Sequence, residues 1–217
     1  MNKPSNETEW LAARRLGMGA TDAAPATGRS RWKDNVTWAK EKLGLVEPED
    51  ISGKPAVQRG KALEPLVRVV FGLDHPEYEV EYNGSFDLVR RPEEPWYLAT
   101  LDGRLTERET GRRGILEIKT GSIASRIAAE QWNGRVPEEY LCQALHQLNA
   151  WLDAAFVVLV AYLKDEDSRN NQTHSTRLYK FEREEYADAA AFLLTEERTA
   201  WGYIERKELP PLILPQL

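Results

Sequence analysis

Two apolar runs that carry charged residues decide how this chain is expected to fold. The first run reads Tyr97-Leu98-Ala99-Thr100-Leu101-Asp102-Gly103-Arg104-Leu105. The second run reads Gly114-Ile115-Leu116-Glu117-Ile118-Lys119-Thr120. The charged segment between them, residues 106–113, fits a β-hairpin connection. We therefore expect paired strands, with one acid at the end of the first run and an acid and a lysine within the second.

The second run alternates between charged and apolar side chains. Side chains of a strand point to alternate faces, so Glu117 and Lys119 share one face. Leu116 and Ile118 then point into the core. If the two runs pair, Asp102 approaches the charged face.

These groups have the chemistry of metal-dependent phosphodiester cleavage. Two carboxylates and a backbone carbonyl are hard oxygen ligands, which suit Mg²⁺ or Mn²⁺. An ammonium group beside them can orient or deprotonate a water, or stabilise a charged phosphate transition state. The spacing alone favours a plainer interpretation, an exposed hairpin face that carries a salt bridge.

Length and composition indicate a globular protein of one domain, residues 1–217, with a core over about residues 9–182. A C-terminal helix and tail are expected over residues 183–217. The single cysteine, Cys142, rules out an internal disulfide framework. No apolar run approaches the ~20 residues that span a bilayer, and the first ten residues lack the apolar core of a signal peptide. We therefore expect a cytoplasmic protein that does not bind membranes.

The net charge of −6 argues against a general nucleic-acid coat protein, which is usually basic. The charge is uneven along the chain. Residues 1–60 carry ten Lys and Arg against eight Asp and Glu, whereas residues 182–208 carry four against eight. Any DNA-binding surface is therefore expected to be local, with the acidic C-terminal region facing away from it.

Periodicity and turn signals divide the rest of the chain into helices and strands. Asn6 has the position of a helix cap, and Asn83-Gly84 is a strong signal for a two-residue hairpin turn. Expected helices cover residues 7–17, 30–44, 55–71, 122–132, 137–152 and 182–207. Expected strands cover residues 78–82, 85–89, 154–163 and 176–181. Residues 209–217 read as an extended apolar tail, which hints at assembly with another subunit.

Five short motifs follow one another in an order that is more informative than any one of them. They are Arg15-Leu16-Gly17 with a small-residue turn, Arg59-Gly60-Lys61-Ala62-Leu63-Glu64, Leu101-Asp102-Gly103, Leu116-Glu117-Ile118-Lys119 and Tyr140-Leu141-Cys142-Gln143. With these motifs the chain resembles the phage lambda exonuclease family of PD-(D/E)XK nucleases, including its YqaJ-type viral recombination members. The resemblance covers about residues 9–163 and reverses the plainer interpretation of the hairpin.

The resemblance implies an α/β fold with a restriction-endonuclease-like core, in which helices flank a mixed central β-sheet. It implies a Mg²⁺-dependent 5′→3′ exonuclease, with Mn²⁺ as a substitute metal. Such an enzyme degrades linear double-stranded DNA to mononucleotides and leaves 3′ overhangs for recombination by single-strand annealing. The family further implies 5′-phosphorylated DNA ends, a ring-shaped homotrimer, a single-strand annealing partner, and a phage or prophage protein in the bacterial cytoplasm.

The resemblance also assigns roles residue by residue. The metal ligands correspond to the carboxylates of Asp102 and Glu117 and the backbone carbonyl of Ile118. Lys119 corresponds to the lysine that positions the attacking water, and Glu64 to a helix acid that assists at the metal.

Further site residues follow from the same motifs. Gln143 and Tyr140 match a glutamine–tyrosine motif on the helix that lines the site. Arg15 corresponds to an arginine that binds the 5′-terminal phosphate, and Thr100 and Thr21 to hydroxyl groups near that phosphate.

The chain departs from the family pattern at three positions. Leu101 stands where a proline often precedes the aspartate, and Leu145 replaces a frequent glutamine. Asp22 stands where the lambda enzyme has a phosphate-contacting serine, and an aspartate would repel phosphate, although Thr21-Asp22 fits the serine–aspartate pair of the YqaJ-type members.

Two other functions remain open from the sequence. A DNA-end-binding recombination scaffold would keep the fold without activity, although every expected catalytic residue type is present. A repair or restriction endonuclease would keep the chemistry and differ by cutting closed circular DNA.

Overall fold

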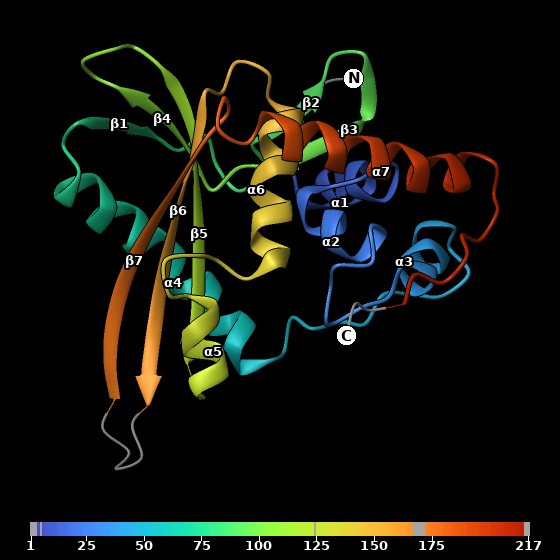
Figure 1. Cartoon of the computed structure of the whole chain (residues 1–217), viewed down its shortest axis with the longest axis horizontal. Coiled ribbons are helices and arrows are strands. Elements are labelled where there is room, and N and C mark those ends of the chain that lie inside the picture. The colour runs from blue at the N-terminus through green and yellow to red at the C-terminus, as the bar shows by residue number, and fades with distance from the viewer. Residues whose placement is uncertain (1–3, 5, 124, 167–171, 215–217) are drawn as a thin grey trace.

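The computed structural model describes residues 4, 6–123, 125–166 and 172–214, and the structural statements below concern that part of the chain. At its centre lies a five-stranded sheet in the order β1-β4-β5-β6-β7 (Figure 1). The strands are β1 (Tyr78–Glu81), β4 (Gly103–Glu107), β5 (Arg113–Ile123), β6 (Phe156–Glu166) and β7 (Gln172–Glu182). β5 and β6 run parallel and the other neighbours antiparallel, so the predicted mixed sheet is confirmed.

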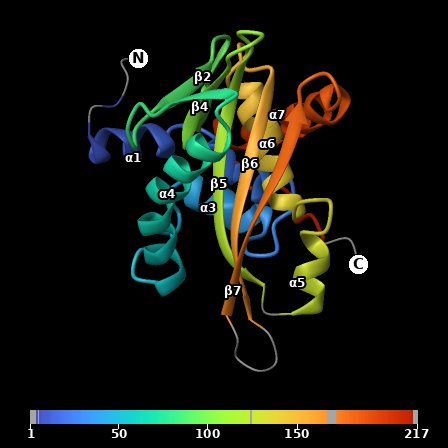
Figure 2. The same ribbon diagram turned by 90° about the vertical axis from the view of Figure 1, so that its left-hand side faces the viewer.

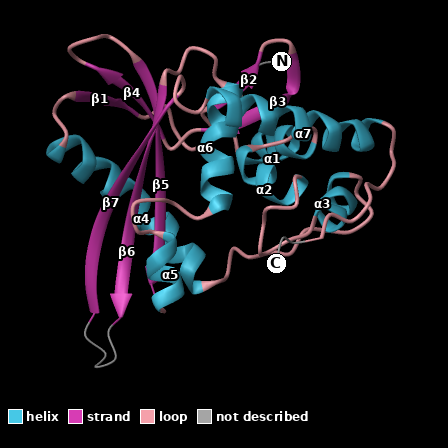
Figure 3. Cartoon of the chain, in the orientation of Figure 1, coloured by secondary structure: helices cyan, strands magenta, loops and turns pink. Residues whose placement is uncertain are grey.

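Helices cover both faces of this sheet, as expected. Helix α4 (Pro55–Asp74) lies on one face, and α6 (Glu138–Ala150) lies on the other with α7 (Ala187–Glu205) against it (Figure 2). The shorter helices are α1 (Glu7–Arg15), α2 (Ala23–Ala26), α3 (Asn35–Lys42) and α5 (Arg126–Gln131) (Figure 3). A 3₁₀ turn covers Ala20–Asp22. In the described residues, no helix is long and apolar enough to cross a membrane.

The two faces of β5 contribute to separate apolar clusters. Leu116 and Ile118 pack on the α4 side with Phe71, as the alternation predicts. Ile115 packs on the α6 side. Glu117 also faces α6 and is only 2% exposed, so the alternative of an exposed hairpin face is wrong.

Close packing fixes the register between β5 and β6. Gly114 lies opposite Phe156, and a Cβ atom on Gly114 would come within 2.1 Å of that ring. Only glycine fits this position without a shift of the ring. The register pairs Gly114 with Phe156 and continues to Ile123 with Asp165, which aligns Glu117 and Lys119 along the central strand.

The expected hairpin over residues 78–89 is wrong. β1 pairs with β4 in the main sheet, whereas β2 (Leu88–Arg91) pairs with β3 (Glu94–Thr100) in a separate two-stranded sheet. The buried Asp87 carboxylate accepts from the Arg104 guanidinium at 2.7 and 2.9 Å. These long-range contacts outweigh the local preference of Asn83-Gly84 for a tight turn.

The apolar run of residues 97–105 is two strands rather than one. β3 ends at Thr100 and β4 begins at Gly103, so Leu101 and Asp102 form a corner between the small sheet and the large one. The Leu101 amide donates to the carbonyl of Asp87 at 3.1 Å, which ties this corner to the preceding loop.

The N-terminal segment lies beside β3. Asn6 caps α1 as predicted, because its side chain accepts from the Glu9 amide at 2.9 Å. The small-residue turn then approaches β3 closely, since a Cβ atom on Gly17 would lie 2.5 Å from Leu98 Cδ2. Helix α3 begins at Asn35 rather than at residue 30, and its cap is Asp34.

The described part of the C-terminal tail, which ends at residue 214, contacts the start of α3. The side chain of Asn35 donates to the Pro211 carbonyl at 2.8 Å and accepts from the Ile213 amide at 3.0 Å. Leu212 and Leu214 remain exposed. Residues 215–217 of the predicted tail, and residues 167–171 between β6 and β7, lie outside the described part of the chain.

Candidate active site

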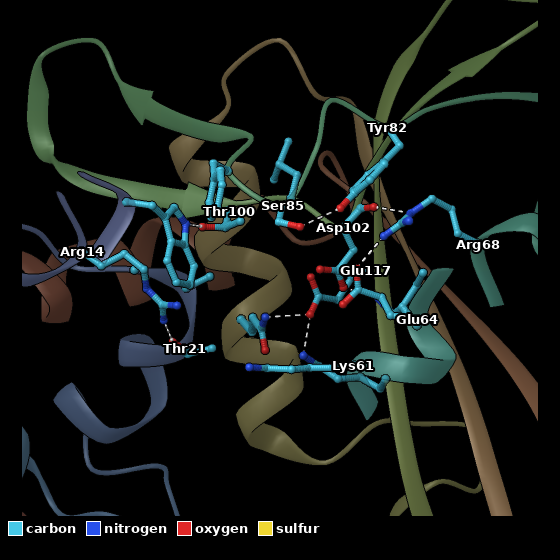
Figure 4. Close-up of a pocket in the computed structure, with 18 of the residues that line it drawn as sticks. Arg14, Thr21, Lys61, Glu64, Arg68, Tyr82, Ser85, Thr100, Asp102 and Glu117 are labelled. Carbon is cyan, nitrogen blue, oxygen red and sulfur yellow. Dashed lines mark hydrogen bonds and ion pairs between the residues drawn. The ribbon is translucent and has the colours of Figure 1, made fainter. Parts of the chain in front are cut away.

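A pocket of about 660 Å³ lies where α4, the corner at Asp102 and the N-terminal segment meet. Five of the predicted catalytic or metal-binding side chains or backbone groups line it: Glu64, Asp102, Glu117, Ile118 and Lys119. Gln143 and the two predicted hydroxyl residues, Thr21 and Thr100, line it as well. Figure 4 shows the acids converging on one part of the pocket, with Arg14 and Thr21 on the opposite side.

Asp102 is fixed at the corner between β3 and β4. Its Oδ2 atom accepts from the Ile118 amide at 2.8 Å, which joins the corner to β5. Burial, together with the negative charges of Glu117 and Glu64, raises the pKa of Asp102 well above its ordinary value. A cation that enters the pocket would stabilise the ionised form of this carboxyl group.

Glu117 is held by three donors. Gln143 Nε2 lies 2.7 Å from its Oε1, and Gln147 Nε2 lies 2.5 Å from its Oε2. Lys119 Nζ lies 2.5 Å from Oε1. Burial opposes the charge on Lys119, but Glu117 and Asp102 outweigh it and raise the pKa of this lysine. Lys119 is therefore a cation at neutral pH.

Arg68 organises the α4 side of the pocket. Its Nη2 pairs with Glu64 Oε1 at 2.5 Å, and its Nε donates to the Asp102 carbonyl at 2.7 Å. Its guanidinium also lies 3.7 Å from the centroid of the Tyr82 ring. The sequence interpretation missed Arg68; its position one helical turn after Glu64 is the signal that could have found it.

The opposite side of the pocket carries a hydrogen-bonding group built from the N-terminal segment and β3. Arg14 Nη2 donates to Thr21 Oγ1 at 2.9 Å. Trp10 Nε1 donates to Thr100 Oγ1 at 2.9 Å, and the Arg14 guanidinium lies over the Trp10 ring.

Arg15, the arginine predicted to bind the 5′-terminal phosphate, does not line this pocket. The Arg15 side chain is 72% exposed and pairs with Glu47 at 3.0 Å. Successive residues of a helix point about 100° apart, so only one arginine of the pair can face the pocket. The structure places Arg14 there, beside the two threonines.

Asp22 does not present its charge to the pocket. Its carboxylate pairs with Lys42 at 2.8 Å and accepts from the Gly19 amide at 2.8 Å and from Trp38 Nε1 at 3.1 Å. Burial would raise the pKa of Asp22, but Lys42 and these hydrogen bonds together lower it. Asp22 therefore stabilises the small-residue turn through the Gly19 amide. The positive charge of Lys42 offsets the negative charge that was expected to repel phosphate.

Tyr140 contacts the site through Lys119. It does not line the pocket, but Lys119 Nζ lies 5.0 Å from the centroid of its ring. Lys61 lines the pocket as well, although the sequence interpretation gave it no role. The sequence interpretation gave no role to Gln147 either, yet this side chain is buried against Glu117.

The chemistry of the site fits a hard divalent cation. Within the described residues, no three acidic, histidine or cysteine side chains are grouped closely enough to hold a metal as they stand. Glu64 pairs with Arg68, and Gln143, Gln147 and Lys119 bind Glu117. Burial and the neighbouring acids Glu117 and Glu64 nevertheless raise the pKa of Asp102, and a bound cation would oppose this shift. Carboxylate and carbonyl oxygens are the ligands that Mg²⁺ and Mn²⁺ take.

The fold and the sequence define the family of this chain. Residues 9–150 match the YqaJ-like viral recombinase domain, and the chain belongs to that family. The predicted resemblance is therefore confirmed.

Individual proteins resemble the chain in sequence or in fold. The chain is 29% identical over 164 residues to the uncharacterized protein YqaJ of Bacillus subtilis strain 168, covering 73% of this chain and 48% of that protein. The chain thus spans about half the length of that relative. The crystal structure of an alkaline exonuclease, LHK-Exo from Laribacter hongkongensis, matches with a TM-score of 0.67 and 22% identity over 92% of this chain and 93% of the other. The same enzyme in complex with dAMP matches over the same shares with a TM-score of 0.68 and 24% identity.

Proposed function

We propose that this chain is a Mg²⁺-dependent 5′→3′ exonuclease that degrades linear double-stranded DNA from phosphorylated ends. The proposal rests on one observation: two sets of side chains with different chemistry line the same pocket. The acids Asp102 and Glu117 with Lys119 occupy one side, and Arg14 with two threonine hydroxyls occupies the other. The first group suits phosphodiester hydrolysis, and the second suits a terminal phosphate.

The chain's own residues prepare the hydrolysis. Asp102, Glu117, Glu64 and the Ile118 carbonyl would hold the metal, and the bound metal would supply an activated water and polarise the scissile phosphate. Lys119 is charged and lies beside Glu117, so it orients the attacking water and stabilises negative charge in the transition state. Tyr140 keeps the ammonium group of Lys119 in place through its ring.

Arg14 carries the proposed recognition of the DNA end. A guanidinium group binds phosphate through two parallel N–H donors, which a lysine cannot reproduce. The Thr21 hydroxyl already accepts from Arg14, and it can donate its own hydrogen to a phosphate oxygen. Thr100 stands in the same relation to Trp10. A terminal phosphate held here leaves the next phosphodiester bond on the side of the acids.

The wider setting of the proposal rests on the family. Mononucleotide products and 3′ single-stranded overhangs would supply recombination by single-strand annealing, with an annealing protein as partner. A homotrimer ring and a phage or prophage origin in the bacterial cytoplasm are parts of the same proposal. LHK-Exo, which has a similar fold, binds the nucleotide dAMP in its crystal structure. That complex supports the proposed mononucleotide product.

The deciding experiment is digestion of a linear duplex that is labelled and phosphorylated at one 5′ end. Mg²⁺-dependent release of the labelled mononucleotide, abolished by EDTA and with closed circles left intact, is the expected result. Cleavage of closed circles would replace the proposal by an endonuclease. DNA binding without any product in Mg²⁺ or Mn²⁺ would replace it by a recombination scaffold.

A further inference from the structure

A buried network joins the C-terminal helix to the helix that lines the active site. Glu197 of α7, His146 of α6 and Tyr97 of β3 are each 0% exposed. Glu197 Oε1 lies 2.7 Å from His146 Nδ1, and Glu197 Oε2 accepts from the Tyr97 hydroxyl. The rings of Tyr97 and His146 stack with their centroids 4.0 Å apart. Helix α7 lies outside the residues 9–150 that match the family.

The hydrogen bonds require Glu197 and His146 to share one proton. His146 Nε2 lies 2.9 Å from the carbonyl oxygen of Leu98, which can only accept, so Nε2 carries a hydrogen. The contact at Nδ1 then needs one further proton, on the imidazole or on the carboxyl group. Burial and the charge of Glu197 raise the pKa of Tyr97, so its hydroxyl stays protonated and donates. The cluster is thus fully hydrogen-bonded with no net charge, as a buried polar network requires.

His146 lies on α6 between the two glutamines that hold Glu117. Gln143 donates to one oxygen of that carboxylate and Gln147 to the other. Gln147 is 0% exposed, and its Oε1 has no hydrogen-bond partner within the described structure. Its side chain is therefore held through Glu117 and through the position of α6. Any displacement of the helix moves both amide donors away from the carboxylate.

We propose that Glu197 is a positioning residue for the metal-binding carboxylate of Glu117. Through His146 it fixes α6 against the Leu98 carbonyl of β3, and the helix then presents Gln143 and Gln147 to Glu117. This inference rests on the proposed function, because it takes Glu117 to be a metal ligand. Residues that orient metal ligands from outside typically change metal affinity when they are removed.

Three variants separate this role from simple stabilisation. Glu197→Ala breaks the network. Glu197→Gln preserves it, because its amide can donate to a neutral His146 while its carbonyl accepts from Tyr97. Leu193→Ala is the matched control, because Leu193 is a buried core residue of the same helix that takes no part in the network.

The readout is Mn²⁺ binding without DNA, followed by electron paramagnetic resonance of the free ion, together with the melting temperature. Glu197→Ala should weaken Mn²⁺ binding by about ten- to a hundredfold, and Glu197→Gln should restore it. Leu193→Ala should lower the melting temperature and leave Mn²⁺ binding unchanged. The Mg²⁺ concentration for half-maximal nuclease activity should shift in the same way, with little change in KM for DNA.

A second variant keeps the inference open to refutation if Glu197→Ala does not fold. Gln147→Met removes the last link to Glu117 and should also weaken Mn²⁺ binding. Wild-type affinity in either Glu197→Ala or Gln147→Met, or an equal loss in Leu193→Ala, would overturn the inference while wild-type protein still cleaves DNA. Wild-type protein that neither binds Mn²⁺ nor cleaves DNA would overturn the proposed function and the inference together.

Discussion

The guanidinium of Arg68 donates to the backbone carbonyl of Asp102 at 2.7 Å, across 34 residues of chain. The same guanidinium pairs with Glu64, so α4 and the corner between the two sheets are held together by one side chain. Arg68→Ala should lower the free energy of unfolding by about 1–3 kcal/mol, because the partly buried carbonyl of Asp102 loses its donor. Urea denaturation measures this loss.

A double-mutant cycle tests whether Arg68 and Glu64 act as a pair. Glu64→Gln combined with Arg68→Ala should give a coupling energy above that of the exposed pair Arg113 and Asp153, for which about 0–1 kcal/mol is typical. Equal coupling energies for the two pairs would show that the partly buried pair of Arg68 and Glu64 has no special role.

Lys119→Ala should abolish cleavage and leave DNA binding largely intact. The reason is that Lys119 is a charged group directed at Glu117, within the acid side of the pocket. The measurement is single-turnover cleavage of a phosphorylated duplex, with binding measured in EDTA. Lys180→Ala is the control, because Lys180 pairs with Glu107 and Glu182 on the surface of β7. Near-wild-type turnover of Lys119→Ala would contradict the assigned role.

Arg14→Ala and Arg15→Ala form a matched pair of adjacent arginines. Arg14→Ala should lose the preference for 5′-phosphorylated over 5′-hydroxyl ends, since the guanidinium in the pocket is removed. Arg15→Ala should keep that preference, because Arg15 pairs with Glu47 at the surface. The ratio of initial rates on the two substrates decides between them. A loss in Arg15→Ala alone would restore the original sequence prediction.

The pair of Asp22 and Lys42 makes stability depend on pH. The pKa of Asp22 is lower in the folded chain than its ordinary value of 3.8. The ionised carboxylate therefore stabilises the fold above that value, and this contribution is lost as the pH falls through the folded pKa. Asp22→Asn should lower the melting temperature most at neutral pH, with a difference from wild type that narrows below pH 3.8.

The control for this pH dependence is Asp153→Asn. Asp153 is an exposed acid whose side chain is 67% accessible, so its replacement should change the melting temperature little at any pH. A difference between Asp22→Asn and wild type that stays constant from neutral pH to acid would show that the pair contributes nothing through its charge.

Most residues on the side of the pocket that holds Asp102, Glu117 and Lys119 could be predicted from the sequence. Alternation along one strand and the expected pairing of the two runs brought Asp102, Glu117 and Lys119 together, and the resemblance added Glu64 and Gln143. These residues do line one pocket, and their shared direction could be predicted because a strand and a helix impose fixed directions on neighbouring side chains. The same rule predicts that Arg14 and Arg15 diverge, but it cannot say which one faces the pocket. That choice depends on how α1 packs beside β3.

The errors in the fold have a common cause. The tight turn at Asn83-Gly84 is a local signal, whereas the pairing of β1 with β4 depends on residues more than twenty positions away. Arg68 and Gln147 were missed for a similar reason, because their partners Asp102 and Glu117 lie about 30 residues away in the chain. Local patterns reveal the elements, and distant contacts decide which elements meet.

The corner between β3 and β4 has one further consequence. Thr100 and Asp102 are separated by two peptide units, a span of at most about 7 Å. If Thr100 holds the terminal phosphate and Asp102 marks the point of cleavage, the length of the product is set by covalent bonds of the protein. The distance along the backbone would then fix the length of each product at one nucleotide. The size of each fragment would not depend on the sequence of the DNA.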